Sequence, residues 1–355
     1  MRKSVVALVF LSTCLSLFAL DESQRLYNEA LTYYEKADYG RALKPCEEAI
    51  RLHKEDIQGQ EEMIKTALKA PQVATVGNSI VEILKVLNKR EEWDYVNLIQ
   101  FYLNKKGEAY FDDNIENLLT YLKKIEFYPE AHKLIGDIYK IEGEYEFAEM
   151  YYKNAIDNAD VLDVVDERYE ILYQLADISR LKGDENEMET RLLGILSEDV
   201  YFTKRTLPEN MVSFIRKNKT DTFEKYFQMY RADNYYMMNA YVQLSDYYFK
   251  KGQMDRALQF CTLATITGFT KIESVISKRD ISFEYTDFKS LLQQASFYDD
   301  IIKWGVDNNF WKTLNMLAII SKTDGNDKFS DALLYVLSEY SPIEYYRREA
   351  VLLLK

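Results

Sequence analysis

Histidine, cysteine and proline are scarce in this 355-residue chain, and each scarcity narrows the possible functions. The chain has 2 His, 3 Cys, 5 Pro and 12 Gly. The histidines, His53 and His132, stand at neither a metal-ligand nor a catalytic-triad spacing, which argues against zinc enzymes and triad hydrolases. So few cysteines do not make a disulfide framework. The shortage of Pro and Gly favours helices over an architecture with many turns.

Motifs that bind phosphates or present a nucleophile are also missing. The sequence contains no Gly-x-x-x-x-Gly-Lys loop, no Gly-x-Ser-x-Gly elbow and no dinucleotide fingerprint. Its 58 Asp and Glu residues make some close carboxylate pair inevitable. A glycosidase-like acid/base pair would still need a globular catalytic domain, for which the repeats described below leave no room. We therefore predict that the protein is not an enzyme and has no cofactor or metal.

Positive charge is in deficit, since 45 Lys and Arg against 58 Asp and Glu give a formal net charge of −13. An acidic chain repels phosphate backbones, which argues against nucleic acid as a partner. The densest basic run is Arg216-Lys217-Asn218-Lys219. Loops carry such charge routinely, and we interpret this run as a solvated surface.

Long apolar runs are confined to the N-terminus. Two basic residues open the chain, an apolar run follows, and Ala19 is a small residue before a polar segment. These features predict a signal peptide over residues 1–20, cut after Ala19, and hence an exported, periplasmic protein. Two alternatives are a retained membrane anchor and lipidation at Cys14, because residues 11–14 resemble a bacterial lipobox.

A repeated pattern dominates the rest of the sequence, and residues 129–162 carry its best copy. Gly136 and Ala148 are small at the places where two antiparallel helices must approach closely. Gly143 opens the tight turn between those helices. Aromatic residues fill the space around the crossing: Tyr139, Tyr145 and Tyr152.

This pattern resembles the tetratricopeptide repeat, a 34-residue helix–turn–helix unit. The resemblance implies an all-α fold, an αα-hairpin solenoid that forms a right-handed superhelix of about nine helix pairs over residues 21–355. The clearest repeats are residues 23–56, 129–162 and 238–271, the degenerate ones are 169–202 and 311–344, and a capping helix follows at 342–355.

Further positions follow from the alignment of the repeats. Cys46 and Cys261 share the column of Tyr152, which predicts that both are buried core residues. The 106 residues between Ala42 and Ala148 are close to three periods, so helix pairs are predicted to fill that interval, one of them beginning at residue 57. Pro45 predicts a bend in its helix. Residues 283–285 are interpreted as a loop. The motif Ser341-Pro342-x-Glu344 predicts a capping box at the start of the last helix. The apolar end of that helix either shields the last repeat or docks a partner.

In proteins that this chain resembles, the first helix of each pair lines a concave partner-binding groove. Asp137, Asp177 and Asp246 share one column of that groove, and such an acidic ladder beside aromatic side chains suits a basic or amphipathic protein segment. The lysine-then-asparagine clamp of the co-chaperone members is absent. The predicted partner-binding positions are Tyr27, Leu31, Tyr34, Lys133, Asp137, Lys140, Tyr173, Asp177, Arg180, Val242, Asp246 and Phe249.

These observations predict an extracytoplasmic scaffold that binds a partner protein in its groove. The alternative is an accessory protein that holds a small apolar ligand for an envelope transporter.

Overall fold

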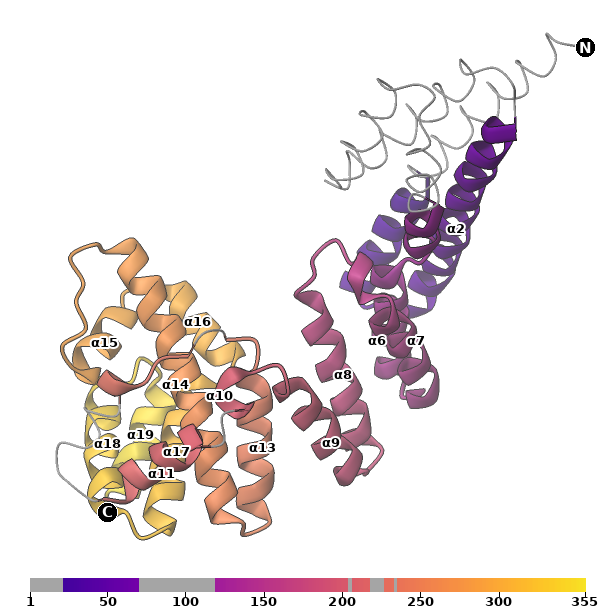
Figure 1. The fold of residues 1–355 in the computed structure, drawn as a ribbon. Coiled ribbons are helices and arrows are strands. Elements are labelled where there is room, and N and C mark those ends of the chain that lie inside the picture. Colours follow the sequence, from indigo (N-terminus) through magenta and orange to yellow (C-terminus); the bar gives the residue numbers. More distant parts are fainter. Residues whose placement is uncertain (1–21, 70–118, 204–205, 218–226, 233–234) are drawn as a thin grey trace, which may run out of the picture. The chain divides into compact units, whose positions relative to one another are not determined.

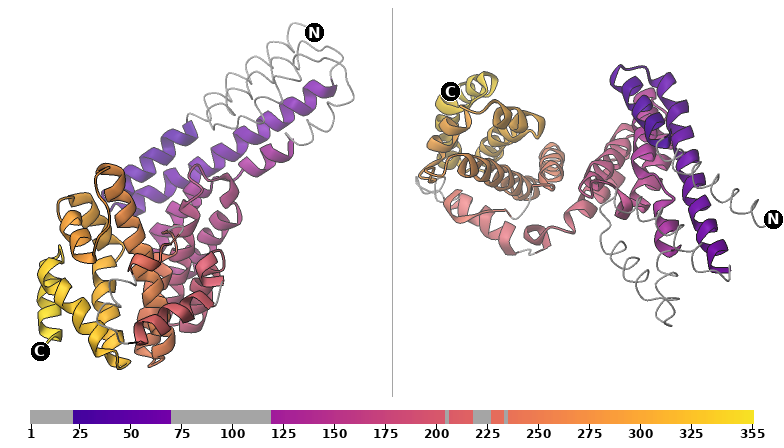
Figure 2. Two further views of the ribbon diagram at one scale, coloured as in Figure 1. Left: turned by 60° about the vertical axis from the view of Figure 1, so that its left-hand side comes forward. Right: turned by 90° about the horizontal axis from the view of Figure 1, so that it is seen from above.

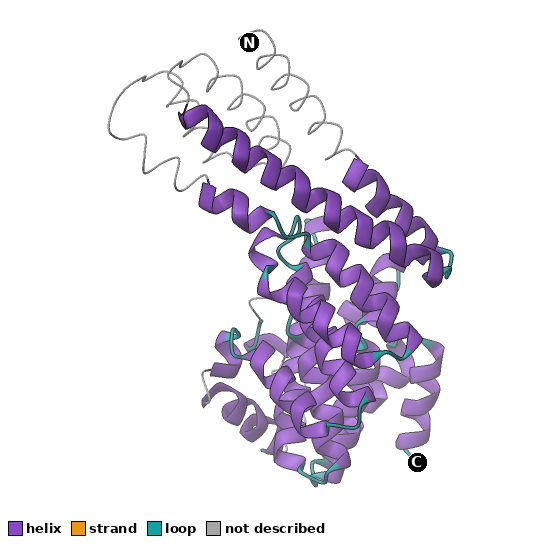
Figure 3. Cartoon of the chain, turned by 90° about the vertical axis from the view of Figure 1, so that its right-hand side faces the viewer, coloured by secondary structure: helices purple, strands orange, loops and turns teal. Residues whose placement is uncertain are grey.

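The computed structural model describes residues 22–69, 119–203, 206–217, 227–232 and 235–355. Helices and the turns between them make up this described part, in which no strand occurs (Figure 3). The predicted all-α, helix-pair fold is thus confirmed. The predicted signal peptide and the helix pairs expected between residues 70 and 118 lie outside the described residues. Among the described helices, none combines the length and the apolarity needed to cross a membrane.

The chain divides into two compact units, Met1–Gly183 and Asp184–Lys355. Figures 1 and 2 show consecutive helices of each unit packed as antiparallel pairs. The described helices of the first unit are residues 22–35, α2 (Tyr39–Lys69), residues 119–125, α6 (Pro129–Glu142), α7 (Tyr145–Asp157), the short η1 (Ala159–Val161) and α8 (Glu167–Leu181).

The second unit is built around α14 (Met254–Arg279), which is buried along most of its length and contacts α11, α13 and α17. The other helices of this unit are α9 (Glu185–Leu196), α10 (Val200–Thr203), α11 (Thr206–Arg216), α13 (Met238–Lys250), α15 (Phe288–Ala295), α16 (Asp299–Asp307), α17 (Phe310–Thr323), α18 (Asp327–Tyr340) and α19 (Glu344–Leu353).

The crossing of α6 and α7 is as tight as the repeat pattern predicts. A Cβ atom added to Gly136 would lie 2.8 Å from the ring of Tyr152, so only glycine fits against that ring. Ala148 and Tyr152 are both fully buried. Gly143 ends α6 with a φ of +83°, and the next residue donates a hydrogen bond to the carbonyl of Tyr139, which closes the turn.

Gly143 has a left-handed backbone and open space around its Cα, so a side chain added there would strain the backbone without a steric clash. We expect Gly143→Ala to lower the free energy of unfolding by about 1–2 kcal/mol, since an L side chain is strained at positive φ. Gly40→Ala is the matched control: it is another open site in the same unit, inside α2, where alanine should stabilise by roughly 0.5–1 kcal/mol. Urea titrations monitored by circular dichroism measure both, and equal effects would contradict the argument.

The first repeat packs directly against α6. The thiol of Cys46 donates to the carbonyl of Ala131 at 3.3 Å, and the alanines around Cys46 share one core with Leu134 and Ile138. The helix pairs predicted to fill the 106-residue interval therefore do not separate these two repeats in space, and those predicted within residues 70–118 stay untested because they lie outside the described residues. The predicted break before residue 57 is wrong, because α2 continues without interruption to Lys69.

Both described cysteines are free and fully buried, as predicted. Burial raises the pKa of each thiol to about 12. Pro45 lies inside α2, and the bend expected there remains a prediction.

The C-terminal helix α19 packs on α17 and α18, but its start differs from the prediction. The helix begins at Glu344, and its N-cap residue, Ile343, makes no side-chain hydrogen bond. Ser341 instead ends α18, where its N–H bonds to the carbonyl of Leu337. The predicted capping box at residues 341–344 is therefore wrong. A capping box does start α15, formed by Asp287 and Ser290 after the loop that was predicted at residues 283–285.

His132 gives the first unit a pH dependence. Its Nδ1 lies 2.8 Å from the carbonyl oxygen of Tyr128, and burial lowers the pKa of the imidazole despite that hydrogen bond. Because the folded-state pKa lies below the value of about 6.5 in unfolded chains, the stability contributed by neutral His132 is present above that pH and is lost as pH falls through the folded-state pKa. We expect the protection factors of the α6 amides, which are corrected for the intrinsic pH dependence of hydrogen exchange, to fall below that pH in the wild type. His132→Phe keeps the aromatic side chain, and its protection factors should fall less. An identical pH profile would contradict this prediction.

Candidate partner-binding face

The predicted site residues of the first unit come from three helices. Residues 22–35 carry Tyr27, Leu31 and Tyr34, α6 carries Lys133, Asp137 and Lys140, and α8 carries Tyr173, Asp177 and Arg180. Positions three, four or seven residues apart lie on one side of a helix, so each helix presents its members together. We call these nine residues the α6–α8 face.

Ion pairs connect α6 to α8 across this face. The ammonium group of Lys133 lies 3.2 Å from Glu170 and 3.8 Å from Asp137. The next pair along the helices joins Lys140 to Asp177 at 2.5 Å. These lysine side chains are only 17% and 19% exposed, so solvent screens the pairs less than ordinary surface ion pairs.

The two aspartates of the face lie in different electrostatic surroundings. Burial raises the pKa of Asp137, and this effect outweighs the attraction of Lys133 and the hydrogen bond donated by the Tyr152 hydroxyl. At Asp177 burial acts in the same direction, but hydrogen bonds from Lys140 and Arg180 prevail and lower the pKa. Asp137 thus accepts a hydrogen bond from Tyr152 inside the crossing of α6 and α7, whereas Asp177 of α8 pairs with Lys140 of α6.

Half-buried aromatic side chains border the ion pairs. Tyr27, Leu31 and Tyr34 pack partly against the core of the first repeat, and the ring of Tyr27 lies 5.2 Å from that of Tyr128. Burial raises the pKa of both Tyr27 and Tyr34. The face therefore combines partly apolar tyrosine surface with fixed charges, a composition common in protein interfaces.

The remaining predicted residues belong to the second unit, on α13. Val242 is only 5% exposed and belongs to the core, so its predicted contact with a partner is wrong. Asp246 pairs with Lys250 of its own helix at 2.6 Å, and Phe249 is half-buried.

The aspartate column is not a ladder of unpaired negative charge, because each member binds a cation of the chain itself. On the α6–α8 face, Lys133, Lys140 and Arg180 balance Asp137, Asp177 and Glu170. The sequence interpretation missed Glu170 and Gln174, which both bind lysines of α6. Their spacing before Asp177, at i−7 and i−3, is the signal that could have identified them.

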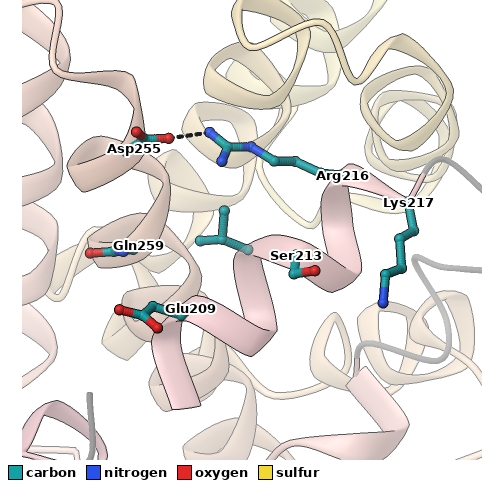
Figure 4. Close-up of a pocket in the computed structure, with 7 residues that line it drawn as sticks. Glu209, Ser213, Arg216, Lys217, Asp255 and Gln259 are labelled. Carbon is teal, nitrogen blue, oxygen red and sulfur yellow. Dashed lines mark hydrogen bonds and ion pairs between the residues drawn. The ribbon is translucent and has the colours of Figure 1, made fainter. Parts of the chain in front are cut away.

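No group of three or more potential metal ligands occurs in the described part of the chain. A pocket of about 410 Å³ lies beside α11 in the second unit, and polar or charged side chains form most of its lining (Figure 4). This pocket does not suit the small apolar ligand of the alternative function, which remains an untested prediction.

The chain is similar in sequence to a bacterial protein, and a family model matches one of its repeats. An uncharacterized protein of Treponema pallidum (strain Nichols) is 28% identical over 333 residues, which cover 93% of this chain and 89% of that protein. The crystal structure of the P58(IPK) TPR domain aligns over 94% of this chain and 88% of its own at 13% identity, with a TM-score of 0.20. The family model of the tetratricopeptide repeat matches residues 239–265. This match lies within the predicted repeat 238–271 and confirms the resemblance to the tetratricopeptide repeat family.

Proposed function

We propose that the protein is an exported, periplasmic scaffold that binds a segment of a partner protein on the α6–α8 face. Repeats of this family serve in general as protein-interaction scaffolds. The observation that carries the proposal is the set of ion pairs that ties two successive first helices together beside half-buried tyrosines.

The charges left exposed on this face define the chemistry of the partner. Lys133 and Lys140 are largely covered, whereas the side chains of Glu170 and Arg180 are 54% and 55% exposed. Opposite charges at two separated points favour an amphipathic segment with a basic side chain at Glu170 and an acidic one at Arg180. Apolar side chains of the same segment would cover Tyr27 and Tyr34, because contact between tyrosine rings and apolar groups removes both from water.

The double reversal Glu170→Lys with Arg180→Glu tests this proposal. The reversal breaks the pairs with Lys133 and Asp177 and inverts the charge pattern seen by a partner. Both side chains are more than half exposed, so the helices should persist, as circular dichroism of the double variant checks. We expect the wild-type protein to capture a specific partner from envelope extracts of its host, as identified by mass spectrometry, and the double variant to lose it. Lys44→Glu, an exposed charge change on α2, should retain capture. Equal recovery of that partner by wild type and double variant would refute the proposed face.

Export is tested separately by the intact mass of the protein purified from its host. Cleavage after Ala19 gives a chain that starts at Leu20. A retained N-terminus would indicate an uncleaved anchor, and a chain that starts at Cys14 with added acyl mass would indicate lipidation. Either result would contradict cleavage after Ala19.

A further inference from the structure

The pocket beside α11 has a fixed cation at one end. Arg216 donates from Nε and Nη2 to the two carboxylate oxygens of Asp324 at 2.7 and 2.9 Å, and a further bond from Nη2 reaches Asp255. This two-point contact holds the guanidinium group in one orientation. Its Nη1 atom donates to no group in the described part of the chain, and two N–H bonds therefore remain for a ligand.

Other polar groups around the pocket also lack partners within the described residues. They are the side chains of Glu209, Ser213, Lys217 and Gln259. Glu209 lies on α11 and Lys217 directly follows the last residue of that helix; both are exposed charges, and Ser213 lies between them (Figure 4). Lys217 lies eight positions after Glu209, which corresponds to about 12 Å along the helix axis.

The balance of charge around the pocket indicates the class of ligand. Glu209 and Asp255 offset Arg216 and Lys217, so the lining itself has no net formal charge, and Asp324, which binds Arg216 from outside the lining, adds one negative charge behind it. The two carboxylates would repel a polyphosphate, and the two cations would repel a metal ion. A neutral ligand with separated charges, one at each end, meets attraction at both ends.

The size of the pocket limits the length of such a ligand. Each residue of an extended peptide spans about 3.3–3.6 Å, so two or three residues bridge roughly 7–11 Å between a free amine and a free carboxylate. The volume of about 410 Å³ lies in the range usual for small-ligand sites. Ser213 and Gln259 lie between the charged ends, where a peptide presents its amide groups.

We propose that this pocket binds a short zwitterionic peptide of two or three residues. Arg216 and Lys217 bind the ligand's carboxylate, Glu209 binds its ammonium group, and Gln259 hydrogen-bonds to an amide between them. The site lies within the second unit and does not depend on the proposed function of the α6–α8 face.

Calorimetric titration of the full chain with trialanine tests the proposal. We expect trialanine to bind, and N-acetyl-trialanine amide, which lacks both terminal charges, to bind at least tenfold more weakly. Glu209→Gln should weaken trialanine at least tenfold and leave the acetylated peptide acid unaffected, while Lys217→Gln should weaken trialanine and leave the peptide amide unaffected. Two exposed residues elsewhere in the unit supply the controls: Lys303→Gln and Glu339→Gln should bind like wild type. Absence of heat at millimolar trialanine, or equal binding of the blocked and free peptides, would overturn the assignment.

Discussion

Replacing Tyr152 by alanine should lower the free energy of unfolding of the first unit by about 3–5 kcal/mol, the range for removal of a fully buried aromatic ring. The ring is 0% exposed and fills the space over Gly136, and its hydroxyl donates to Asp137. The turn at Gly143 keeps α6 and α7 adjacent, so the helices have little freedom to close the cavity. Such a loss is a large share of the 5–15 kcal/mol that stabilises a typical domain.

Two further variants separate the ring from the hydroxyl. Tyr152→Phe keeps the ring and leaves Asp137 without its donor, which should cost about 1–3 kcal/mol. Met150→Ala removes a long side chain from the same helix at a position that is 45% exposed, and we expect a change within about 0.5 kcal/mol. Hydrogen exchange in α6 and α7 reports on this unit alone. The crossing would not be the main source of stability if Tyr152→Ala exchanged no faster than Met150→Ala.

The helix pairs could be predicted from the sequence because their determinants are local. Gly136, Ala148 and Tyr152 specify a close crossing within 17 residues of chain, and Gly143 specifies the turn between the helices. The corresponding turn of the first repeat has Ala37 in the left-handed conformation, with a φ of +57°. A pattern that relies on glycine does not reveal that turn, although its backbone is the same.

The order of the repeats in space could not be predicted, because periodicity records spacing along the chain and not contact. Cys46 and Ala131 are 85 residues apart, yet they share a hydrogen bond. The period counted between Ala42 and Ala148 carries no information about which helices touch. The continuation of α2 to Lys69 was missed for a related reason, since no residue type interrupts helix propensity where one repeat length ends.

The candidate site was predicted in part. The column alignment places Asp137 and Asp177 on the first helices, where the structure has them. The pair between helices is invisible to a single column, because Lys140 lies 37 positions before Asp177. The same limitation affects Arg216, interpreted as part of a solvated basic run, since its partner Asp324 follows 108 positions later. The pairs of Lys133 with Asp137 and of Arg180 with Asp177 lie within one helix, and their i,i+4 and i,i+3 spacing is visible in the sequence.

Trp311 provides the corresponding test of the second unit. The indole is 1% exposed, and its Nε1 donates to the carbonyl of Ile302 at 3.1 Å. A Cβ atom on Gly305 would overlap the indole, and the ring of Phe310 packs edge-on at 5.0 Å. The tryptophan therefore packs the start of α17 against the side of α16 that carries Ile302 and Gly305. We expect Trp311→Ala to cost about 3–5 kcal/mol, as for other buried aromatic residues.

Trp311→Phe distinguishes the volume of this side chain from its hydrogen bond. Phenylalanine retains most of the apolar contact with Gly305 but leaves the Ile302 carbonyl without its donor, so about 1–3 kcal/mol should be lost. Gly305→Ala adds a methyl group on the other side of the same contact, and the resulting overpacking should cost about 1–3 kcal/mol. Combined with Trp311→Ala, which removes the ring that the new methyl group would strike, Gly305→Ala should add much less than it does alone. Hydrogen exchange in α16 and α17 measures all four variants without depending on tryptophan fluorescence. Strict additivity of the two alanine substitutions would show that the indole does not rest on Gly305, and the assignment of Trp311 as the link between these helices would then fail.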